Sequence, residues 1–339
     1  MYQRIRVFIQ YVLILGVTFF LLWFSLQGIQ VEEGHNKWEY ILNTWYSAKK
    51  GWLILMVVFF MVSNILRAER WRMLLFSAGH STTLYKSFLS VMIGYLVNLV
   101  IPRGGEVSRC YNLYKLDKIP VEISFGTVVV ERIIDVFFLV IVLMLAFSVE
   151  SEKLIDFIFS LPIQPLVGKN KILMLLGVLI VIGIITGLAI IVLRRNQKLN
   201  DRVRKIWSGF KAGLVSVSKV ENKSLFVFHS VGIWVLYFMM SYSVIQSFDE
   251  TSFLGIGAVL SIFAIGTIAM AVPLPGGTGS YHVLIPAGLV TLYQLPKANA
   301  VSFTFVFHAW QTLIIIIGGL IALILSWLLL KNNTQARAK

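Results

Sequence analysis

Long uninterrupted apolar runs are the feature of this sequence that most restricts its fold. Several extend over about 18 to 25 residues, and a helix of that length, rising 1.5 Å per residue, crosses the roughly 30 Å hydrocarbon core of a bilayer. Of the 339 residues, 58% are hydrophobic and only 14% are charged, and one soluble core cannot bury so many apolar runs. A water-soluble enzyme is excluded, and the sequence predicts an all-α, polytopic bundle of membrane helices.

The apolar runs also mark where the chain is expected to cross or enter the membrane. The first run is too long for the core of a cleavable signal and is interpreted as a membrane helix. The runs cover residues 7–26, 51–66, 84–101, 121–147, 172–193, 225–248, 253–272, 280–292 and 301–330.

The distribution of basic residues predicts the direction of the crossings. The connector 194–223 carries nine Lys or Arg residues against two acidic residues, which is typical of a cytoplasmic segment. Basic residues also flank both ends of the chain, so both termini are expected in the cytoplasm of a bacterial-type plasma membrane. If the run 84–101 crossed fully, the basic connector would lie outside, so residues 84–118 must return to the side from which they start. Asp249 and Glu250 indicate the outside, and the basic residues after the last run indicate the inside, so residues 253–295 also start and end on one side.

Two re-entrant hairpins satisfy this requirement. Residues 84–118 and 253–295 are each interrupted by helix-breaking residues, Pro102 in the first and the cluster 273–279 in the second. Such breaks are tolerated at membrane depth where they are buried in protein or line a wet cavity. We expect the first hairpin to enter from the cytoplasm and the second from the opposite face.

The two halves of the chain then match in inverted order within a single membrane domain, 1–339. The N-terminal half, 1–150, and the inverted C-terminal half, 224–331, are linked by the span 172–193 and the connector 194–223. Broken segments at corresponding places in inverted halves point to a transport site near the bilayer midplane. An irregular helical bundle without internal symmetry is the alternative.

The run 121–147 carries Glu131, Arg132 and Asp135 near its middle. An unpaired charge there costs at least about 2.5 to 3.5 kcal/mol, so partners are expected. Glu131 and Asp135 share a helix face, and Arg132 and Asp135 are close enough to pair. Two interpretations stay open: an ion pair between helices that fixes their packing, or an arginine that neutralises an anionic substrate in a hydrated cavity.

The first hairpin tip, residues 98–109, combines glycines with arginines. Glycines let backbone amides approach a ligand, and a helix that begins after Gly105 offers free N–H groups to an anion. The alternative is an amphipathic stretch at the membrane interface. No Gly-Lys-Ser/Thr sequence follows, so this is not a nucleotide-binding loop. The candidate residues of this tip are Asn98, Arg103, Gly104, Gly105, Glu106 and Arg109.

The second hairpin tip, residues 273–279, carries no charge. Its candidate residues are Gly276, Gly277 and Gly279, whose amides precede a short helix that starts at Ser280. His282 is the nearest titratable group, and a lone histidine on such a helix is more often a packed, hydrogen-bonded residue than a ligand.

Other features give no indication of a cofactor or metal. The single cysteine, Cys110, excludes a disulfide framework, and the histidine spacing does not suggest a metal site. Arg70 and Trp71 follow a span directly and are interpreted as an interfacial anchor that touches headgroups. The basic connector is expected to lie on anionic lipid as a surface helix and not to bind nucleic acid, because topology explains its charge.

Taken together, these motifs resemble the membrane region of the lysylphosphatidylglycerol synthase family over roughly residues 4–330. The resemblance implies a membrane protein that moves a phospholipid or a polyprenyl-phosphate lipid between leaflets. We expect a standalone member without the soluble synthase domain, and His282 stands where the family commonly has an acidic residue. The motifs are Arg70-Trp71, Asn98, Pro102, Gly105-Glu106, Arg109, Glu131-Arg132, Asp135 and 275–279, and the matching polar positions are Arg103, Glu106, Arg109, Glu131, Arg132 and Asp135.

The sequence therefore predicts a lipid flippase or scramblase, not an enzyme, whose partners are anionic membrane lipids. Arg103, Arg109 and Arg132 are the expected phosphate ligands. Two alternatives stay open. One is an accessory subunit of a lipid or glycan synthase, and the other is a membrane transferase with Glu106 or His282 as its general base.

Overall fold

The structure is a computed structural model that describes residues 16, 18–26, 36–160 and 197–338. The predicted span 172–193 and half of the run 7–26 lie outside the described residues. Every regular element in the described part is a helix, which confirms the all-α prediction. The elements are α2 (Lys37–Ser47), α3 (Lys50–Ser77), α4 (Leu84–Asn98), α5 (Gly104–Asp117), α6 (Val121–Ser160), α8 (Gln197–Val215), the 3₁₀-helix η2 (Ser216–Lys219), α9 (Lys223–Ser247), α10 (Asp249–Ser252), α11 (Ile256–Ala271), the 3₁₀-helix η3 (Pro275–Gly277), α12 (Ser280–Tyr293) and α13 (Lys297–Ala338).

Three of the described helices are long and apolar enough to cross a membrane: α3, α9 and the part Lys297–Asn332 of α13. Their outer faces expose large apolar side chains, for example Ile54 on α3 and Ile324 on α13, as expected where lipid replaces water. The chain is therefore a multi-pass helical membrane protein. α3 extends beyond the predicted end of its run, and Arg67 and Arg70 in this extension are buried inside the protein.

The first hairpin consists of α4 and α5, which lie against each other. Thr83 caps the start of α4 by accepting a hydrogen bond from the backbone N–H of Lys86 at 3.3 Å. Asp117, the last residue of α5, pairs with Lys86 and accepts a hydrogen bond from Thr82 at 2.7 Å. The beginning and the end of this hairpin are therefore side by side, so the chain returns to where it started.

The second hairpin consists of α11 and α12, joined by the second tip. Glu150 ties both of its arms to α6, because its carboxylate accepts hydrogen bonds from Ser261 of α11 at 2.8 Å and from Tyr293 of α12. Glu150 itself has non-helical backbone angles and kinks α6 at this point.

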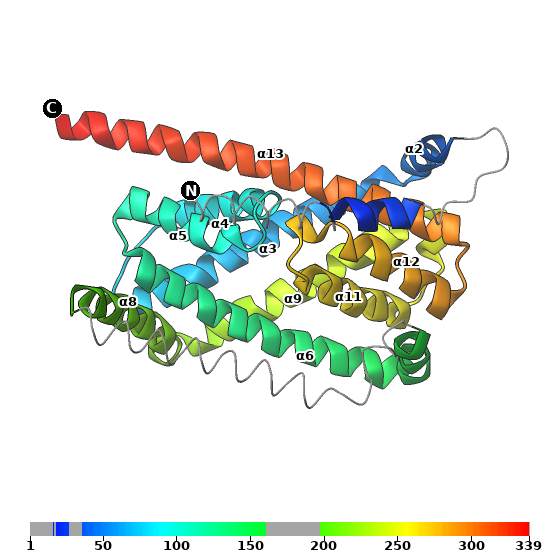
Figure 1. The fold of residues 1–339 in the computed structure, drawn as a ribbon, viewed down its shortest axis with the longest axis horizontal. Coiled ribbons are helices and arrows are strands. Elements are labelled where there is room, and N and C mark those ends of the chain that lie inside the picture. The colour runs from blue at the N-terminus through cyan, green and yellow to red at the C-terminus, as the bar shows by residue number, and fades with distance from the viewer. Residues whose placement is uncertain (1–15, 17, 27–35, 161–196, 339) are drawn as a thin grey trace.

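The two hairpins lie in opposite halves of the molecule (Figure 1). The α4–α5 hairpin lies toward the end occupied by α8, and the α11–α12 hairpin lies toward the other end. Between them, α3 packs along α9, α4 packs against α13, and α11 packs against α6. Each hairpin thus contacts the long helix that follows the other hairpin.

The basic connector contains helix α8, which packs along the first turns of α6. Gly126 of α6 and Gly213 of α8 permit this approach. A Cβ on Gly126 would lie 2.5 Å from the carbonyl oxygen of Phe210, and one on Gly213 would lie 2.6 Å from that of Ile123. α8 therefore belongs to the packed bundle, while Trp207 on its outer side stays exposed.

Candidate functional site

Seven charged side chains from three helices meet inside the bundle, and we call them the charged cluster. Four are arginines and three are carboxylates, so the group carries a formal excess of one positive charge. Its members are Arg67 and Arg70 of α3, Glu106 and Arg109 of α5, and Glu131, Arg132 and Asp135 of α6.

The carboxylates of Glu131 and Asp135 face the arginines of α3. Asp135 lies 2.8 Å from Arg70 and 3.3 Å from Arg67, measured between carboxylate oxygens and guanidinium nitrogens. Glu131 lies 3.5 Å from Arg70 and 3.9 Å from Arg67. Glu131 and Asp135 are one helical turn apart and lie on the same face of α6, as predicted. This face packs against the face of α3 that carries Arg67 and Arg70.

Arg109 completes the buried side of the charged cluster. Its guanidinium pairs with Glu131, whose side chain is 0% exposed, and lies over the ring of Trp71 at 4.7 Å from the ring centroid. The indole N–H of Trp71 donates a hydrogen bond to the hydroxyl of Thr127 at 2.9 Å. Arg109 is therefore held by protein groups. Its buried guanidinium does not have the open position that direct binding of a phosphate, as predicted, would require.

The interfacial interpretation of Arg70 and Trp71 is wrong, because both side chains are fully buried. The surface arginine of this part of α3 is Arg72, whose side chain is 44% exposed. Its guanidinium nitrogen lies 2.5 Å from a carboxylate oxygen of Glu69. Arg67 and Arg70 are buried because α6 supplies two carboxylates, which replace the hydration that these cations lose.

Arg132 occupies the open edge of the charged cluster. It donates to Glu106 at 2.8 Å and lies 3.6 Å from Asp135, the local pair that the spacing predicts. Its side chain is 40% exposed. Arg132 thus has a fixed position, while its side chain stays partly exposed.

The glycines of the first tip serve helix packing, which corrects the expectation that they expose amides to a ligand. A Cβ on Gly105 would overlap the carbonyl oxygen of Gly94 on α4, and one on Gly104 would lie 2.6 Å from the side chain of Ile101. The N–H of Gly105 is also not free, because it donates to the side chain of Asn98 at 2.7 Å.

The two tips touch each other. Arg103, which has a left-handed backbone conformation with φ of 61°, donates from its guanidinium to the carbonyl oxygen of Ala271 at 2.8 Å. Gly276, with φ of 58°, lies so close to Leu99 that an added Cβ would be 2.8 Å from it. Residues 99–103 and 271–276, far apart in sequence, therefore form one junction.

The rest of the second tip is held by histidines. His308 of α13 hydrogen-bonds the carbonyl oxygen of Gly276 at 3.0 Å. His282 packs against Phe305 and His308 and contacts the N–H of Gly279 at 3.4 Å. His282 is buried and does not line the central cavity described next, an arrangement that matches the packed, hydrogen-bonded interpretation.

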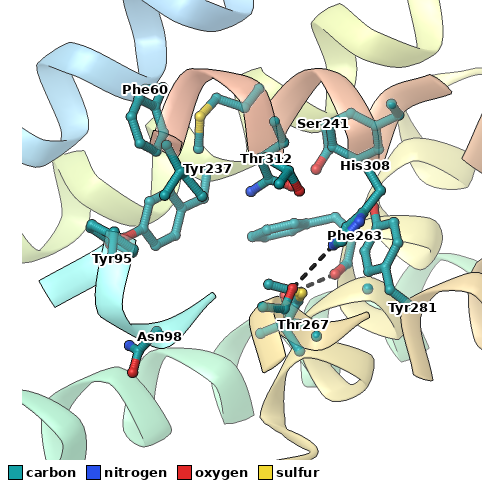
Figure 2. Close-up of a pocket in the computed structure, with 18 of the residues that line it drawn as sticks. Phe60, Tyr95, Asn98, Tyr237, Ser241, Phe263, Thr267, Tyr281, His308 and Thr312 are labelled. Carbon is teal, nitrogen blue, oxygen red and sulfur yellow. Dashed lines mark hydrogen bonds between the residues drawn. The ribbon is translucent and has the colours of Figure 1, made fainter. Parts of the chain in front are cut away.

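A cavity of about 320 Å³ opens at the junction of the tips, and we call it the central cavity (Figure 2). Of the candidate residues, Asn98, Arg103, Glu106, Arg132, Gly276 and Gly277 line it. Gly104, Gly105, Arg109, Glu131, Asp135 and Gly279 do not line it, nor do the accessory candidates Arg70 and Trp71. The rest of its wall combines aromatic and apolar side chains with uncharged polar ones contributed by α4, α9, α11 and α13.

A smaller void of about 20 Å³ lies behind the central cavity. It shares Tyr95, Asn98, Glu106 and Arg132 with the cavity wall and reaches Arg67 and Arg109. Its volume suffices for about one water molecule. Buried charges and residues of the central cavity thus border the same small void.

Sequence reasoning missed several residues of this site. Arg67 belongs to the charged cluster, and Tyr237 of α9 accepts a hydrogen bond from it at 2.7 Å. The available signal was spacing: Arg67 precedes Arg70 by three residues and so lies on the same helix face. Ser241, Gln311 and Thr312 gave no signal, because single uncharged polar residues are common in membrane helices.

The fold and the buried charges define a multi-pass membrane protein with a polar site between its helices. The chain belongs to the lysylphosphatidylglycerol synthase TM region family, whose model matches residues 7–319. This confirms the family that the motifs predicted. A 98-residue stretch, 28% of this chain, is 32% identical to the UPF0104 membrane protein MJ1595 of Methanocaldococcus jannaschii, and it spans 29% of that relative's length. No solved structure matches the chain.

Proposed function

We propose that this protein is a flippase or scramblase that moves an anionic phospholipid or polyprenyl-phosphate lipid between leaflets. The observation that carries the proposal is the central cavity, which both hairpin tips line together with Arg103 and Arg132. The lipid phosphate binds at these arginines while the acyl chains stay in the bilayer. The volume of about 320 Å³ is at the small end of ligand sites, which are typically about 300 to 1,000 Å³, and suits a headgroup better than a whole lipid.

The lengths of the hairpin arms support re-entrant segments. α4, α5, α11 and α12 have 15, 14, 16 and 14 residues. At 1.5 Å per residue these helices are about 21 to 24 Å long, less than the roughly 30 Å of the hydrocarbon core. Each hairpin enters the membrane, turns at its tip and leaves on the side from which it entered.

An inverted repeat is supported by the order and packing of the helices. Each half consists of a long helix, a hairpin and another long helix, and the reciprocal packing of α4 on α13 and of α11 on α6 relates the halves. Both hairpins also end alike. Lys118 and Gln294 have left-handed backbone angles, and each is followed two residues later by a proline that immediately precedes the next long helix.

The orientation follows from the position of the charges. The end that contains α8 is cytoplasmic because of the basic connector, and the C-terminal end of α13 lies at the same end of the molecule (Figure 1). The first hairpin enters from this side and the second from the outside. The membrane is the plasma membrane, and both termini are cytoplasmic.

The two alternative roles have less support. A transferase needs an accessible general base, but Glu106 is engaged by Arg132 and His282 is buried away from the central cavity. An accessory subunit needs no cavity between its hairpin tips. Transport by the purified protein alone separates the proposal from both.

A liposome assay with matched arginine variants tests the proposed role of Arg132. The reconstituted protein should let a membrane-impermeant reductant bleach acyl-labelled phosphatidylglycerol from both leaflets. Arg132→Gln should lower the rate to that of protein-free liposomes, because it removes the positive charge at the open edge of the charged cluster. Arg132→Lys should retain part of the rate, since it keeps the charge but not the planar guanidinium.

Arg72→Gln is the control, because Arg72 is an exposed arginine that pairs only with Glu69 among the described residues. It should transport like the wild type. A folded Arg132→Gln variant that transports at the wild-type rate would refute the assignment of Arg132.

A further inference from the structure

Three uncharged polar side chains on the wall of the central cavity have no hydrogen-bond partner among the described residues. They are Ser241 of α9 and Gln311 and Thr312 of α13. Both helices are long and apolar enough to cross a membrane, and polar groups without partners are costly in such surroundings. These three side chains therefore require water or a ligand in the cavity.

The three side chains come from α9 and α13, whereas the arginines of the cavity wall come from the first tip and α6. Gln311 and Thr312 follow His308 by three and four residues, so all three share the face of α13 that lines the cavity. Figure 2 shows Ser241, His308 and Thr312 apart from Asn98, the first residue of the first tip. The cavity wall thus combines a charged part, which we call the charged end and which consists of Arg103, Glu106 and Arg132, with an uncharged, hydrogen-bonding part on α9 and α13.

The charged end is unsuited to a cationic headgroup. Arg103 and Arg132 outnumber Glu106, the one acidic residue on the described part of the cavity wall. One carboxylate oxygen of Glu106 accepts from Arg132, and the other is buried without a partner. A positively charged group therefore meets excess positive charge and no open carboxylate.

We infer that the lipid carries a phosphate esterified with a neutral, hydroxyl-bearing group, which Ser241, Gln311 and Thr312 recognise. This inference rests on the proposed function and specifies its substrate class. The phosphate occupies the Arg103–Arg132 end, and the hydroxyl groups exchange hydrogen bonds with the three side chains. Glycerol and a sugar both have this chemistry, so phosphatidylglycerol and a glycosylated polyprenyl phosphate are the two sources to separate.

Native mass spectrometry of retained lipids tests this inference without any transport step. The purified protein is equilibrated with equal amounts of phosphatidylglycerol, phosphatidic acid and lysylphosphatidylglycerol. A second mixture contains a polyprenyl phosphate with and without one sugar. Phosphatidylglycerol with phosphatidic acid, and the polyprenyl phosphate with and without its sugar, form two pairs. In at least one pair the wild type should retain the lipid with the hydroxyl-bearing group about tenfold better than the bare phosphate, the factor that roughly 1.4 kcal/mol represents. It should retain the cationic lysylphosphatidylglycerol least.

The triple variant Ser241→Ala, Gln311→Leu, Thr312→Val should lose this preference while still retaining the bare phosphate lipid. The matched control Ser148→Ala, Thr291→Val removes two hydroxyl groups at exposed positions outside the cavity and should keep the preference. A preference within the phosphatidylglycerol pair identifies glycerol, and one within the polyprenyl pair identifies a sugar.

Equal retention within both pairs, best retention of the cationic lipid, or an unchanged preference in a folded triple variant would overturn the inference. Failure of the proposed function has a different signature. In that case the wild type moves no lipid in the liposome assay, while the retention preference persists.

Discussion

At the scale of single residues, the charged cluster shows how a membrane protein keeps arginines in its interior. Arg67, Arg70 and Arg109 each contact Glu131, and removal of one partner from a buried pair leaves uncompensated charge. Glu131 is therefore a structural counter-ion that holds three helices together. Arg132 is different, because its side chain is partly exposed and lines the central cavity.

Neutralisation of Glu131 should destabilise the protein. Glu131→Gln keeps the shape of the side chain but leaves three buried guanidinium groups with one carboxylate fewer, and the expected loss is about 3 to 5 kcal/mol in the free energy of unfolding. Glu69→Gln is the matched control, because its pair with the exposed Arg72 is worth only about 0 to 1 kcal/mol. Thermal unfolding in detergent measures both, and similar midpoints for the two variants would count against a structural role for Glu131.

Arg70 illustrates what sequence reasoning cannot reach at this scale. A cation that follows an apolar run normally extends to the headgroups, so an interfacial anchor was the natural expectation. The carboxylates that bury Arg70 lie 61 and 65 residues further along the chain. Only the packing of α3 against α6 reveals them. Glu131 and Asp135, by contrast, were identified because their helical spacing alone places them on one face.

At the scale of elements, the first hairpin depends on a close contact between helix backbones. α4 and α5 approach at Gly94 and Gly105, and a Cβ on Gly105 would overlap the carbonyl oxygen of Gly94. Sequence patterns predicted the breaks at Pro102 and at 273–279, because proline and glycine restrict helices locally. The sequence patterns did not distinguish the two possible roles of the glycines, because close packing of helices and close approach of a ligand both require the absence of a Cβ.

Gly105→Ala should therefore disrupt the first hairpin. The added methyl group would overlap the backbone of α4, which cannot move as a flexible side chain can, and overpacking of this kind costs about 1 to 3 kcal/mol. Gly51→Ala is the control, because nothing lies within 4 Å of its Cβ position, and alanine favours a helix over glycine by up to about 1 kcal/mol. Unfolding midpoints should fall for the first variant and hold or rise for the second. A Gly105→Ala protein as stable as the wild type would contradict this packing.

At the scale of the whole molecule, apolar length was sufficient to predict the class of fold, and short motifs were sufficient to predict the family. The central cavity was predictable only in part. The expectation that the two tips share a cleft agrees with the contact of Arg103 with Ala271, but the wall formed by Ser241, Gln311 and Thr312 depends on how α9 and α13 pack. Neither composition nor periodicity contains that information.

The central claim is that two hairpins enter the membrane from opposite sides and bring their tips to one cavity. Cysteine labelling with a membrane-impermeant reagent, in a Cys110→Ala background, measures this most directly. Single cysteines at the exposed positions Ser81 and Lys115 bracket the first hairpin, and those at Glu250 and Lys297 bracket the second. In this topology, Glu250→Cys and Lys297→Cys should react in intact cells, whereas Ser81→Cys and Lys115→Cys should react only after permeabilisation. A hairpin whose two flanking cysteines react from different sides, or two hairpins that react from the same side, would contradict it.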